Sequence, residues 1–248
     1  MENKLLQYTR KVVKIIQQEG LATFVGKALY FLRRMLRKME MKILSRFYIW
    51  GFHRLYYYSN VWTNTYIFGV PISKCPLDLW IYQETIFETK PDFIIETGTY
   101  KGGSALFFAS ICELIGHGQV VTIDIEDHDI PFHPRITKIV GNSVSEEIVK
   151  EVKKLVNNKR CMVVLDSAHN KEHVLKEMEL YGEFVSKGCY LVVEDTNING
   201  HPVLPEFGPG PMEAVEEFLR KRGDFAIDLK KEKFMLTFFP KGFLKRIR

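Results

Sequence analysis

The chain has 248 residues, of which 46% are hydrophobic and 26% are charged, values that are ordinary for a globular protein. This length allows one large α/β domain, or one domain with an appendage. The net charge of +5 is unevenly spread: residues 1–46 carry eleven basic and three acidic side chains, whereas residues 47–248 carry 24 basic and 27 acidic ones. The larger part therefore lacks the basic surface that a nucleic-acid partner needs, and the basic segment indicates a local anionic partner.

The cysteines and the N-terminus bear on the cellular compartment. The four cysteines form no CxxC pair, so we interpret them as small buried residues in a reducing compartment: Cys75, Cys112, Cys161 and Cys189. Basic residues interrupt any apolar core of a secretory signal near the N-terminus, and no stretch approaches the roughly 18 uncharged apolar residues of a membrane span. We therefore predict a cytoplasmic protein, either free or attached peripherally to the inner face of the membrane.

Residues 1–67 are predicted to form a basic, helical and aromatic-rich arm. A helical pattern at 3–19 is broken by Gly20, and apolar residues then recur at helical spacing over 21–43, with basic residues on much of the other face. Such a helix can lie on an anionic membrane, or it can dock on the domain or on a second subunit, which would make the chain a homo-oligomer. Residues 47–68 carry ten aromatic side chains, which suit a membrane interface, a subunit contact or an ordinary core.

Residues 68–248 are predicted to form one α/β domain. Apolar strand-like runs at 92–98, 119–126, 135–143, 161–166 and 189–195 alternate with helical patterns at 75–89, 102–116, 145–156, 171–185 and 210–223. Continuous β-branched runs between amphipathic helices predict a mostly parallel sheet that is buried on both faces. Ser145 is the expected N-cap of its helix, and residues 225–240 are expected to close the sheet as an antiparallel hairpin.

Ligands of such a sheet bind beyond the carboxyl ends of the strands. The first strand runs into ETGTYKGGS, residues 96–104, where three glycines allow a tight turn and a close approach of backbone to ligand. This stretch is neither GxGxxG nor a P-loop, so the usual dinucleotide and triphosphate signatures are absent. A glycine turn of this kind is as often structural as functional, and Glu96 within it could hold a ligand amine or order the loop.

The second and third strands end in residues that suit a nucleoside. A carboxylate at Asp124 can accept hydrogen bonds from both ribose hydroxyls, although the acids that follow it also suit a solvated loop. Asn142 and Ser143, at the end of the third strand, could reach an adenine ring. Each of these signals is weak alone.

Three carboxylates end the next two strands. Parallel neighbours would bring Asp166, Glu194 and Asp195 to one edge of the sheet, where they would repel one another unless a cation neutralised them. An all-oxygen set suits Mg²⁺, while the alternative is that one or two of them merely cap helices. His169, three residues after Asp166, could act as a base on a hydroxyl beside the ion, or could be a surface histidine, as His173 also could.

These motifs occur in an order that resembles one family. Residues from about 68 to 243 are similar to the cephalosporin hydroxylase/rhamnosyl O-methyltransferase family. The resemblance is carried by KCPLDLWIYQE, IIETGTYKGGSALFFAS, VVTIDIE, HPRI, VVLDSAHNKEHVLKEMELY, YLVVEDTNINGHPV and FGPGPMEAVEEFL. It implies the Rossmann-like class I methyltransferase fold, with a mostly parallel seven-stranded sheet whose last strand is antiparallel. The arm has no part in the match.

The resemblance also implies ligands and roles for the motif residues. S-adenosylmethionine would bind over Glu96, Gly98, Thr99, Tyr100, Gly102, Gly103, Ser104, Asp124, Asn142, Ser143 and Asp166. Mg²⁺ would bind Asp166, Glu194 and Asp195. Catechol-type O-methyltransferases place a lysine base three residues after the first metal aspartate, whereas metal-dependent sugar methyltransferases place a histidine there, and His169 matches the latter.

The sequence therefore predicts an Mg²⁺-dependent O-methyltransferase that uses S-adenosylmethionine to methylate a hydroxyl of a sugar diol. The basic arm favours a lipid-linked glycan or glycolipid as the acceptor. One alternative is the same chemistry on a small non-sugar metabolite, and another is a non-catalytic subunit that only binds the cofactor. His201 and Glu206, in the proline- and glycine-rich stretch 199–211, are candidates for acceptor contacts or are ordinary loop residues.

Overall fold

A computed structural model describes residues 13–14, 16–18 and 20–248. The chain divides into two compact units, with the division between Gly51 and Phe52. The helix predicted at 3–19 lies largely outside the described residues, and 13–14 and 16–18 are helical. The helix predicted from Leu21 is α2 (Leu21–Tyr58), whose last turns belong to the larger unit. None of the helices in the described ranges has the length and apolar character that a membrane crossing needs.

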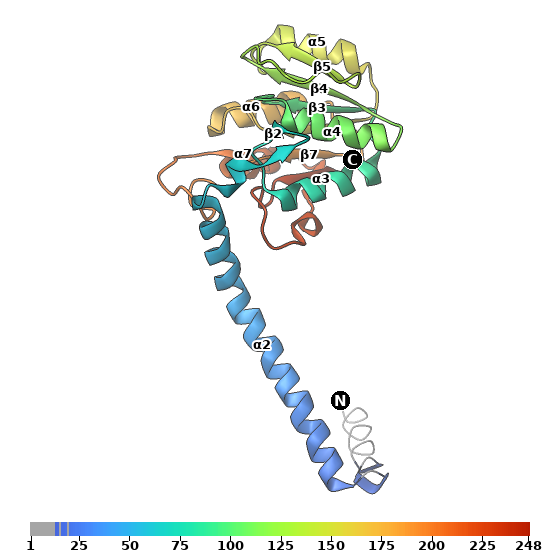
Figure 1. Ribbon diagram of the computed structural model, residues 1–248, viewed down its shortest axis with the longest axis vertical. Helices are drawn as coiled ribbons and strands as arrows, with labels where there is room; N and C mark the ends of the chain where they lie inside the picture. The colour runs from blue at the N-terminus through green and yellow to red at the C-terminus, as the bar shows by residue number, and fades with distance from the viewer. Residues whose placement is uncertain (1–12, 15, 19) are drawn as a thin grey trace. The chain divides into compact units, whose positions relative to one another are not determined.

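The larger unit is built on a seven-stranded sheet with the order β5-β4-β3-β6-β7-β9-β8 (Figure 1). Its strands are β3 (Phe93–Thr97), β4 (Gln119–Asp124), β5 (Ile136–Val140), β6 (Cys161–Leu165), β7 (Tyr190–Val193), β8 (Phe225–Ile227) and β9 (Phe243–Arg246). Strands β3 to β7 pair in parallel, and β9 is antiparallel to both of its neighbours. This arrangement confirms the predicted fold class.

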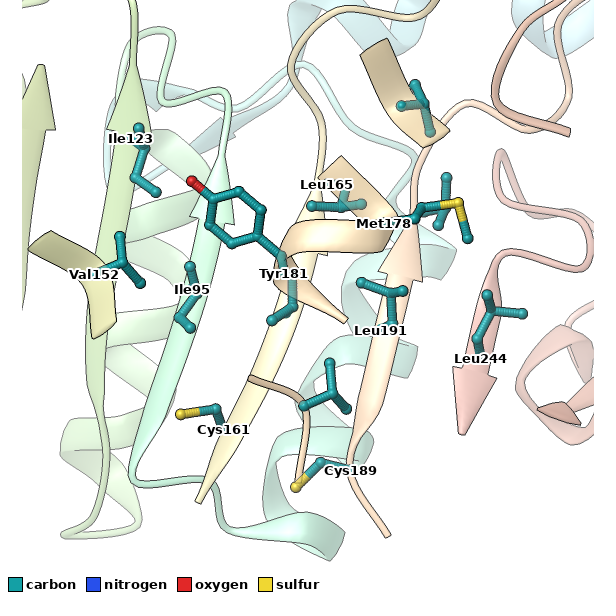
Figure 2. Packing of buried hydrophobic residues seen from close by; sticks show 14 of the residues in the cluster. Ile95, Ile123, Val152, Cys161, Leu165, Met178, Tyr181, Cys189, Leu191 and Leu244 are labelled. Atoms are coloured by element: carbon teal, nitrogen blue, oxygen red, sulfur yellow. The ribbon is translucent and has the colours of Figure 1, made fainter. Parts of the chain in front are cut away.

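Helices cover both faces of the sheet. The helices of the larger unit are α3 (Pro76–Thr89) and α4 (Gly103–Leu114) on one face, and α5 (Glu146–Val156), α6 (Lys171–Tyr181) and α7 (Pro211–Lys221) on the other. Adjacent strand residues alternate between the two faces: Ile94 packs with α3 and α4, and Ile95 packs with the other three helices. Figure 2 shows Ile95, Leu165 and Leu191 in the cluster that Tyr181 of α6 joins. Burial on both faces explains the continuous apolar runs of the strands.

Local capping matches the prediction at α5. Ser145 has an extended backbone and its Oγ accepts a hydrogen bond from the amide of Ile148, at 3.4 Å. Asn170 caps α6 in the same way, accepting from the amide of His173 at 2.9 Å. The second cap matters for the site, because it fixes where α6 begins after the β6 strand.

The hairpin predicted for residues 225–240 is wrong in its second arm. Strand β8 pairs with β9 at 243–246, and the intervening chain contains the short helix η2 (Leu229–Glu232). The apolar residues Leu236, Phe238 and Phe239 are instead buried in irregular backbone against the face that α3 and α4 cover. The amide of Phe238 donates to the buried Asp78 carboxylate at 2.8 Å, so this segment satisfies its backbone without joining the sheet.

The aromatic-rich segment after Gly51 packs as part of the larger unit. It contains η1 (Val61–Asn64) and a two-stranded hairpin of β1 (Tyr66–Ile67) and β2 (Val70–Pro71), which the sequence analysis did not predict. His53 hydrogen-bonds Asn197 at 3.0 Å, and Arg54 donates to the carbonyl of Pro202 at 2.8 Å. These contacts tie the last turns of α2 to the loop that follows β7.

Candidate active site

Two cavities lie beyond the carboxyl ends of the parallel strands. The first has a volume of about 500 Å³ and is lined by Gly98, Tyr100, Ile123, Asp124, Ile125, His128, Gly141, Asn142, Ser143, Asp166, Ser167, Ala168 and His173. The second has a volume of about 230 Å³ and is lined by Trp62, Pro71, Ile72, Ser73, Gly98, Thr99, Tyr100, Gly103, Ser104, Asp166, His169 and Asp195. Gly98, Tyr100 and Asp166 line both, so the two cavities meet at the end of β3 and β6.

Gly98 is required at this junction by both its conformation and its surroundings. Its φ is +90°, and a Cβ there would lie 2.0 Å from the carbonyl oxygen of Asp166. The turn after it is held by Asp124, whose Oδ2 accepts hydrogen bonds from the amides of Thr99 and Tyr100, each at 2.9 Å. The glycine turn and the acid at the end of β4 therefore form one structural unit on the wall of the first cavity.

A buried glutamate is linked to this turn through Thr122, whose hydroxyl lies 2.7 Å from that of Thr99. Glu96 is fully buried, its Oε2 accepts from the hydroxyl of Thr122 at 2.6 Å, and its Oε1 has no partner in the described part of the chain. Burial raises the pKa of Glu96 to about 7, although the charge of Lys74 acts in the opposite direction. Of the remaining residues in the predicted glycine-rich stretch, Gly102 caps the start of α4, and Gly103 and Ser104 line the second cavity.

Three side chains that line the first cavity are held by a second buried glutamate, Glu177, which was not predicted from the sequence. Glu177 of α6 accepts from the hydroxyls of Ser143 and Ser167, at 2.5 and 2.8 Å, and lies 3.4 Å from Nε2 of His173. The hydrogen bond to Glu177 raises the pKa of His173. His173, which the sequence could not separate from a surface histidine, thus lines the cavity beside the predicted Asn142 and Ser143. Its spacing of four residues from Glu177 on one helix was the available signal.

The second cavity is lined by two of the three predicted acids and by the predicted histidine. Asp166, His169 and Asp195 each offer a ligand atom within 4.8 Å of the others, and all three are half-buried. Nε2 of His169 lies 3.4 Å from Oδ2 of Asp195. The ends of β6 and β7 bring these side chains together because the two strands are parallel neighbours, as the sequence analysis expected.

Glu194, the third predicted acid, points into the protein and meets a lysine that the sequence analysis did not single out. Nζ of Lys74 lies 2.7 Å from Oδ2 of Asp166 and 2.6 Å from Oε2 of Glu194. The hydroxyl of Tyr82 donates to the other Glu194 oxygen at 2.7 Å. Burial alone would lower the pKa of Lys74, but the charges of Asp166 and Glu194 outweigh it and raise the pKa above its usual value.

Carboxyl groups outnumber ammonium groups in this cluster. One ammonium, that of Lys74, faces the three carboxylates of Asp166, Glu194 and Asp195. Burial and the charge of Asp166 raise the pKa of Glu194, and burial raises the pKa of Asp195 although His169 opposes it. Each carboxylate oxygen that accepts one hydrogen bond keeps a second lone pair. An oxygen-rich, negatively charged cluster of this kind fits a hard divalent cation.

The two loop residues predicted to contact the acceptor lie elsewhere. Nε2 of His201 is 2.9 Å from Oε1 of Glu213, which also accepts from Asn199 at 3.0 Å, and Glu206 is exposed. Neither residue is among the described residues that line the two cavities. The structure therefore brings the strand-end residues together but leaves His201 and Glu206 outside.

The family whose model matches this chain and two of its relatives share the description rhamnosyl O-methyltransferase. Residues 59–247 match the family described as Rhamnosyl O-methyltransferase/CmcI. A rhamnosyl O-methyltransferase of Mycobacterium leprae is 41% identical over 203 residues, which cover 79% of this chain and 89% of the relative. One of Mycobacterium bovis is 41% identical over 204 residues, covering 79% of this chain and 83% of the relative.

Solved structures resemble the fold at lower sequence identity. An apo structure of CmcI is 19% identical and superposes with a TM-score of 0.60 over 75% of this chain and 77% of that chain. A CmcI structure described as holding Mg and SAM is 21% identical, with a TM-score of 0.59 over 75% of this chain and 78% of that chain. These likenesses support the fold that the strand order shows.

Replacing Lys74 with Met is expected to destabilise the protein, because the ammonium that pairs with Asp166 and Glu194 is removed. Loss of one partner of a buried ion pair leaves uncompensated charge, so the free energy of unfolding in metal-free buffer should fall by about 3–5 kcal/mol. The measurement is urea denaturation at pH 8, with Lys187→Met, at an exposed lysine, as the matched control. Equal stability of the two variants would contradict this account of Lys74.

Proposed function

Because the chain belongs to the rhamnosyl O-methyltransferase/CmcI family, we propose that it is an Mg²⁺-dependent O-methyltransferase that transfers the methyl group of S-adenosylmethionine to a sugar hydroxyl. The observation that carries the proposal is the junction of the two cavities at Gly98 and Asp166. One cavity has groups that suit a nucleoside, and the other has acids and a histidine that suit a hydroxyl. A methyl donor and its acceptor would meet at that junction.

In this proposal the cofactor occupies the first cavity. Asp124 already accepts two backbone hydrogen bonds through Oδ2 and one through Oδ1, and its remaining lone pairs can accept from ribose hydroxyls. Asn142, Ser143 and His173 would surround the adenine. The buried Glu177 holds Ser143 and His173 in place. The absence of a side chain at Gly98 would let the methyl-bearing end approach Asp166 and the second cavity.

The proposed Mg²⁺ site consists of Asp166 and Asp195, with Glu194 as the third predicted ligand. The carboxylate oxygens that this cluster offers within reach of one another support this assignment. When bound, the ion would make an acceptor hydroxyl more acidic and hold it in place. Lys74 would keep Asp166 and Glu194 in position from the buried side, through the hydrogen bonds it already makes.

His169 is the proposed base. Its Nε2 would take the proton of the acceptor hydroxyl, and Asp195 at 3.4 Å would stabilise the imidazolium that forms. The acceptor oxygen would then attack the methyl carbon as the carbon–sulfur bond breaks, leaving S-adenosylhomocysteine. Much of the rate enhancement would come from holding the two reactants at the junction of the cavities.

The Asp124→Ala variant tests the cofactor site. Loss of the carboxylate removes both the ribose contact and the two hydrogen bonds that hold the glycine turn, so the affinity for S-adenosylmethionine should fall at least about 100-fold. Isothermal titration calorimetry of the purified protein measures this, with Asp129→Ala at a neighbouring exposed acid as the control. Absence of S-adenosylmethionine binding by the parent protein would overturn the proposed function itself.

We further propose that α2 attaches the protein peripherally to an anionic membrane. Exposed apolar residues recur at helical spacing along α2: Val25, Leu29, Leu32, Leu36 and Met39. At 100° per residue they form a stripe that is about 80° wide. Exposed basic residues lie away from it: Arg33, Arg34, Arg37 and Lys38. Exposed Tyr30 and Met41 lie among these basic residues. Such a helix can bury the stripe at the boundary of a bilayer while its basic side chains meet lipid headgroups.

The charge of α2 favours a membrane over a second copy of the helix. Residues 21–50 contain seven basic side chains and one acidic one, Glu40. Pairing two such helices would bring like charges together without enough acids to neutralise them, whereas an anionic surface complements them. An enzyme held at the membrane in this way would reach a sugar acceptor that carries a lipid.

Flotation of the full-length protein with vesicles tests this second proposal. The protein should float with vesicles that contain phosphatidylglycerol and not with vesicles of phosphatidylcholine alone. The combined change of Arg33, Arg34, Arg37 and Lys38 to Gln should abolish flotation, because each basic side chain contributes about 1 kcal/mol to the free energy of binding an anionic membrane. The control variant replaces Lys150, Lys153, Lys154 and Lys159, which are also exposed, with Gln. Equal flotation of the two variants, or dimerisation without lipid binding, would argue against the membrane.

A further inference from the structure

The second cavity has two chemically different sets of lining groups. Asp166, His169 and Asp195 supply charge and hydrogen-bonding atoms, whereas Trp62 of η1 supplies an aromatic surface. The mechanism proposed above uses the first set and leaves Trp62 without a role. Because both sets line one small cavity, a ligand there would meet polar and aromatic groups at the same time.

Trp62 is held in one orientation by the protein around it. Its Nε1 donates to the carbonyl of Tyr57 at 2.9 Å, so the polar atom of the indole is already satisfied. Its ring stacks on that of Tyr57, with centroids 5.5 Å apart and planes at 26°, and it meets the ring of Phe238 edge-on at 5.5 Å. What the indole offers to the cavity is therefore a fixed apolar surface, which costs a ligand no ordering of the side chain.

The wall of the cavity next to Trp62 is formed by the end of β2 and the start of α4, which are tightly packed against each other. A Cβ at Gly103 would lie 2.2 Å from the carbonyl oxygen of Pro71, so the start of α4 packs directly against the end of β2. Ile72 and Ser73 follow on this wall, and the next residue is Lys74, whose ammonium bonds Asp166. The chain from Trp62 to Lys74 thus links the aromatic surface to the acidic cluster through a short, packed segment.

The volume of the second cavity and its polar and aromatic lining indicate which class of ligand it can bind. A volume of about 230 Å³ lies below the roughly 300–1,000 Å³ of pockets for drug-sized ligands, so the cavity suits a single ring. A pyranose has hydroxyls around its rim and apolar C–H bonds on its face. Such a ring can place two hydroxyls at the acids and one face on an indole. Relatives that are rhamnosyl O-methyltransferases favour this ligand over a planar phenol.

We propose that Trp62 is the acceptor-binding platform of this enzyme, on which the C–H face of the sugar ring stacks while its hydroxyls face Asp166, His169 and Asp195. This inference rests on the proposed function and adds the residue that selects a sugar ring. Trp62 binds the acceptor and takes no part in proton or methyl transfer. Its loss should therefore raise the KM for the acceptor and change kcat little.

The test compares Trp62→Leu with Trp80→Leu, a control at an exposed tryptophan on α3 that lines neither cavity among the described residues. The acceptor probe is methyl α-L-rhamnopyranoside, with S-adenosylmethionine and Mg²⁺ present. Trp62→Leu should raise the acceptor KM at least about tenfold, with an unchanged calorimetric Kd for S-adenosylmethionine, and Trp62→Phe should recover part of the loss. An unchanged KM in Trp62→Leu, with cofactor binding intact, would overturn the proposal.

A binding measurement separates this proposal from the proposed function. In a Trp50→Phe, Trp80→Phe variant the only tryptophan left is Trp62, whose fluorescence reports on the cavity. Titration with the rhamnoside should give a saturable change, and titration with catechol should not. Saturation by catechol alone, or no change with the rhamnoside, would refute the sugar platform even if S-adenosylmethionine binds normally. Failure of S-adenosylmethionine to bind would instead refute the proposed function.

Discussion

The site depends on one buried ion pair network, in which a single ammonium holds two carboxylates at the ends of neighbouring strands. Lys74 reaches Asp166 at the end of β6 and Glu194 after β7, and Tyr82 fixes the other oxygen of Glu194. Burying these charges is costly, and one lysine cannot neutralise three acids. The fold therefore maintains a fixed cluster in which carboxyl groups outnumber ammonium groups, a composition that suits a hard divalent cation.

The second constraint is steric and lies at the junction of the two cavities. Gly98 passes so close to the carbonyl of Asp166 that no side chain would fit, and its positive φ turns the chain toward the amides that Asp124 accepts from. Gly98 follows β3 directly and lines both the cavity that suits a nucleoside and the acidic one, so the two cavities adjoin at this turn. The proposed cofactor and acceptor sites therefore both depend on this single turn.

Much of the fold could be predicted because burial on both faces leaves a clear pattern of apolar strands between amphipathic helices. One exception was the segment with Leu236, Phe238 and Phe239, which fill the core from irregular backbone, where the Asp78 carboxylate accepts from the amide of Phe238. Periodicity cannot detect such a segment, nor did it indicate the short β1–β2 hairpin. Asp166, Glu194 and Asp195 were predictable as strand ends. Lys74 and Trp62 were not, because they precede the sheet in sequence and reach the site only through tertiary packing.

The most direct test of the account is transfer of a labelled methyl group from S-adenosylmethionine to a rhamnose-bearing glycoside, followed by mass spectrometry of the product. The account predicts labelled O-methyl sugar in the presence of Mg²⁺, none with EDTA, and none with the Asp166→Ala variant even though that variant remains folded. Equal transfer in EDTA would contradict the role of the acidic cluster. Absence of transfer to any sugar diol, with S-adenosylmethionine bound, would contradict the sugar acceptor.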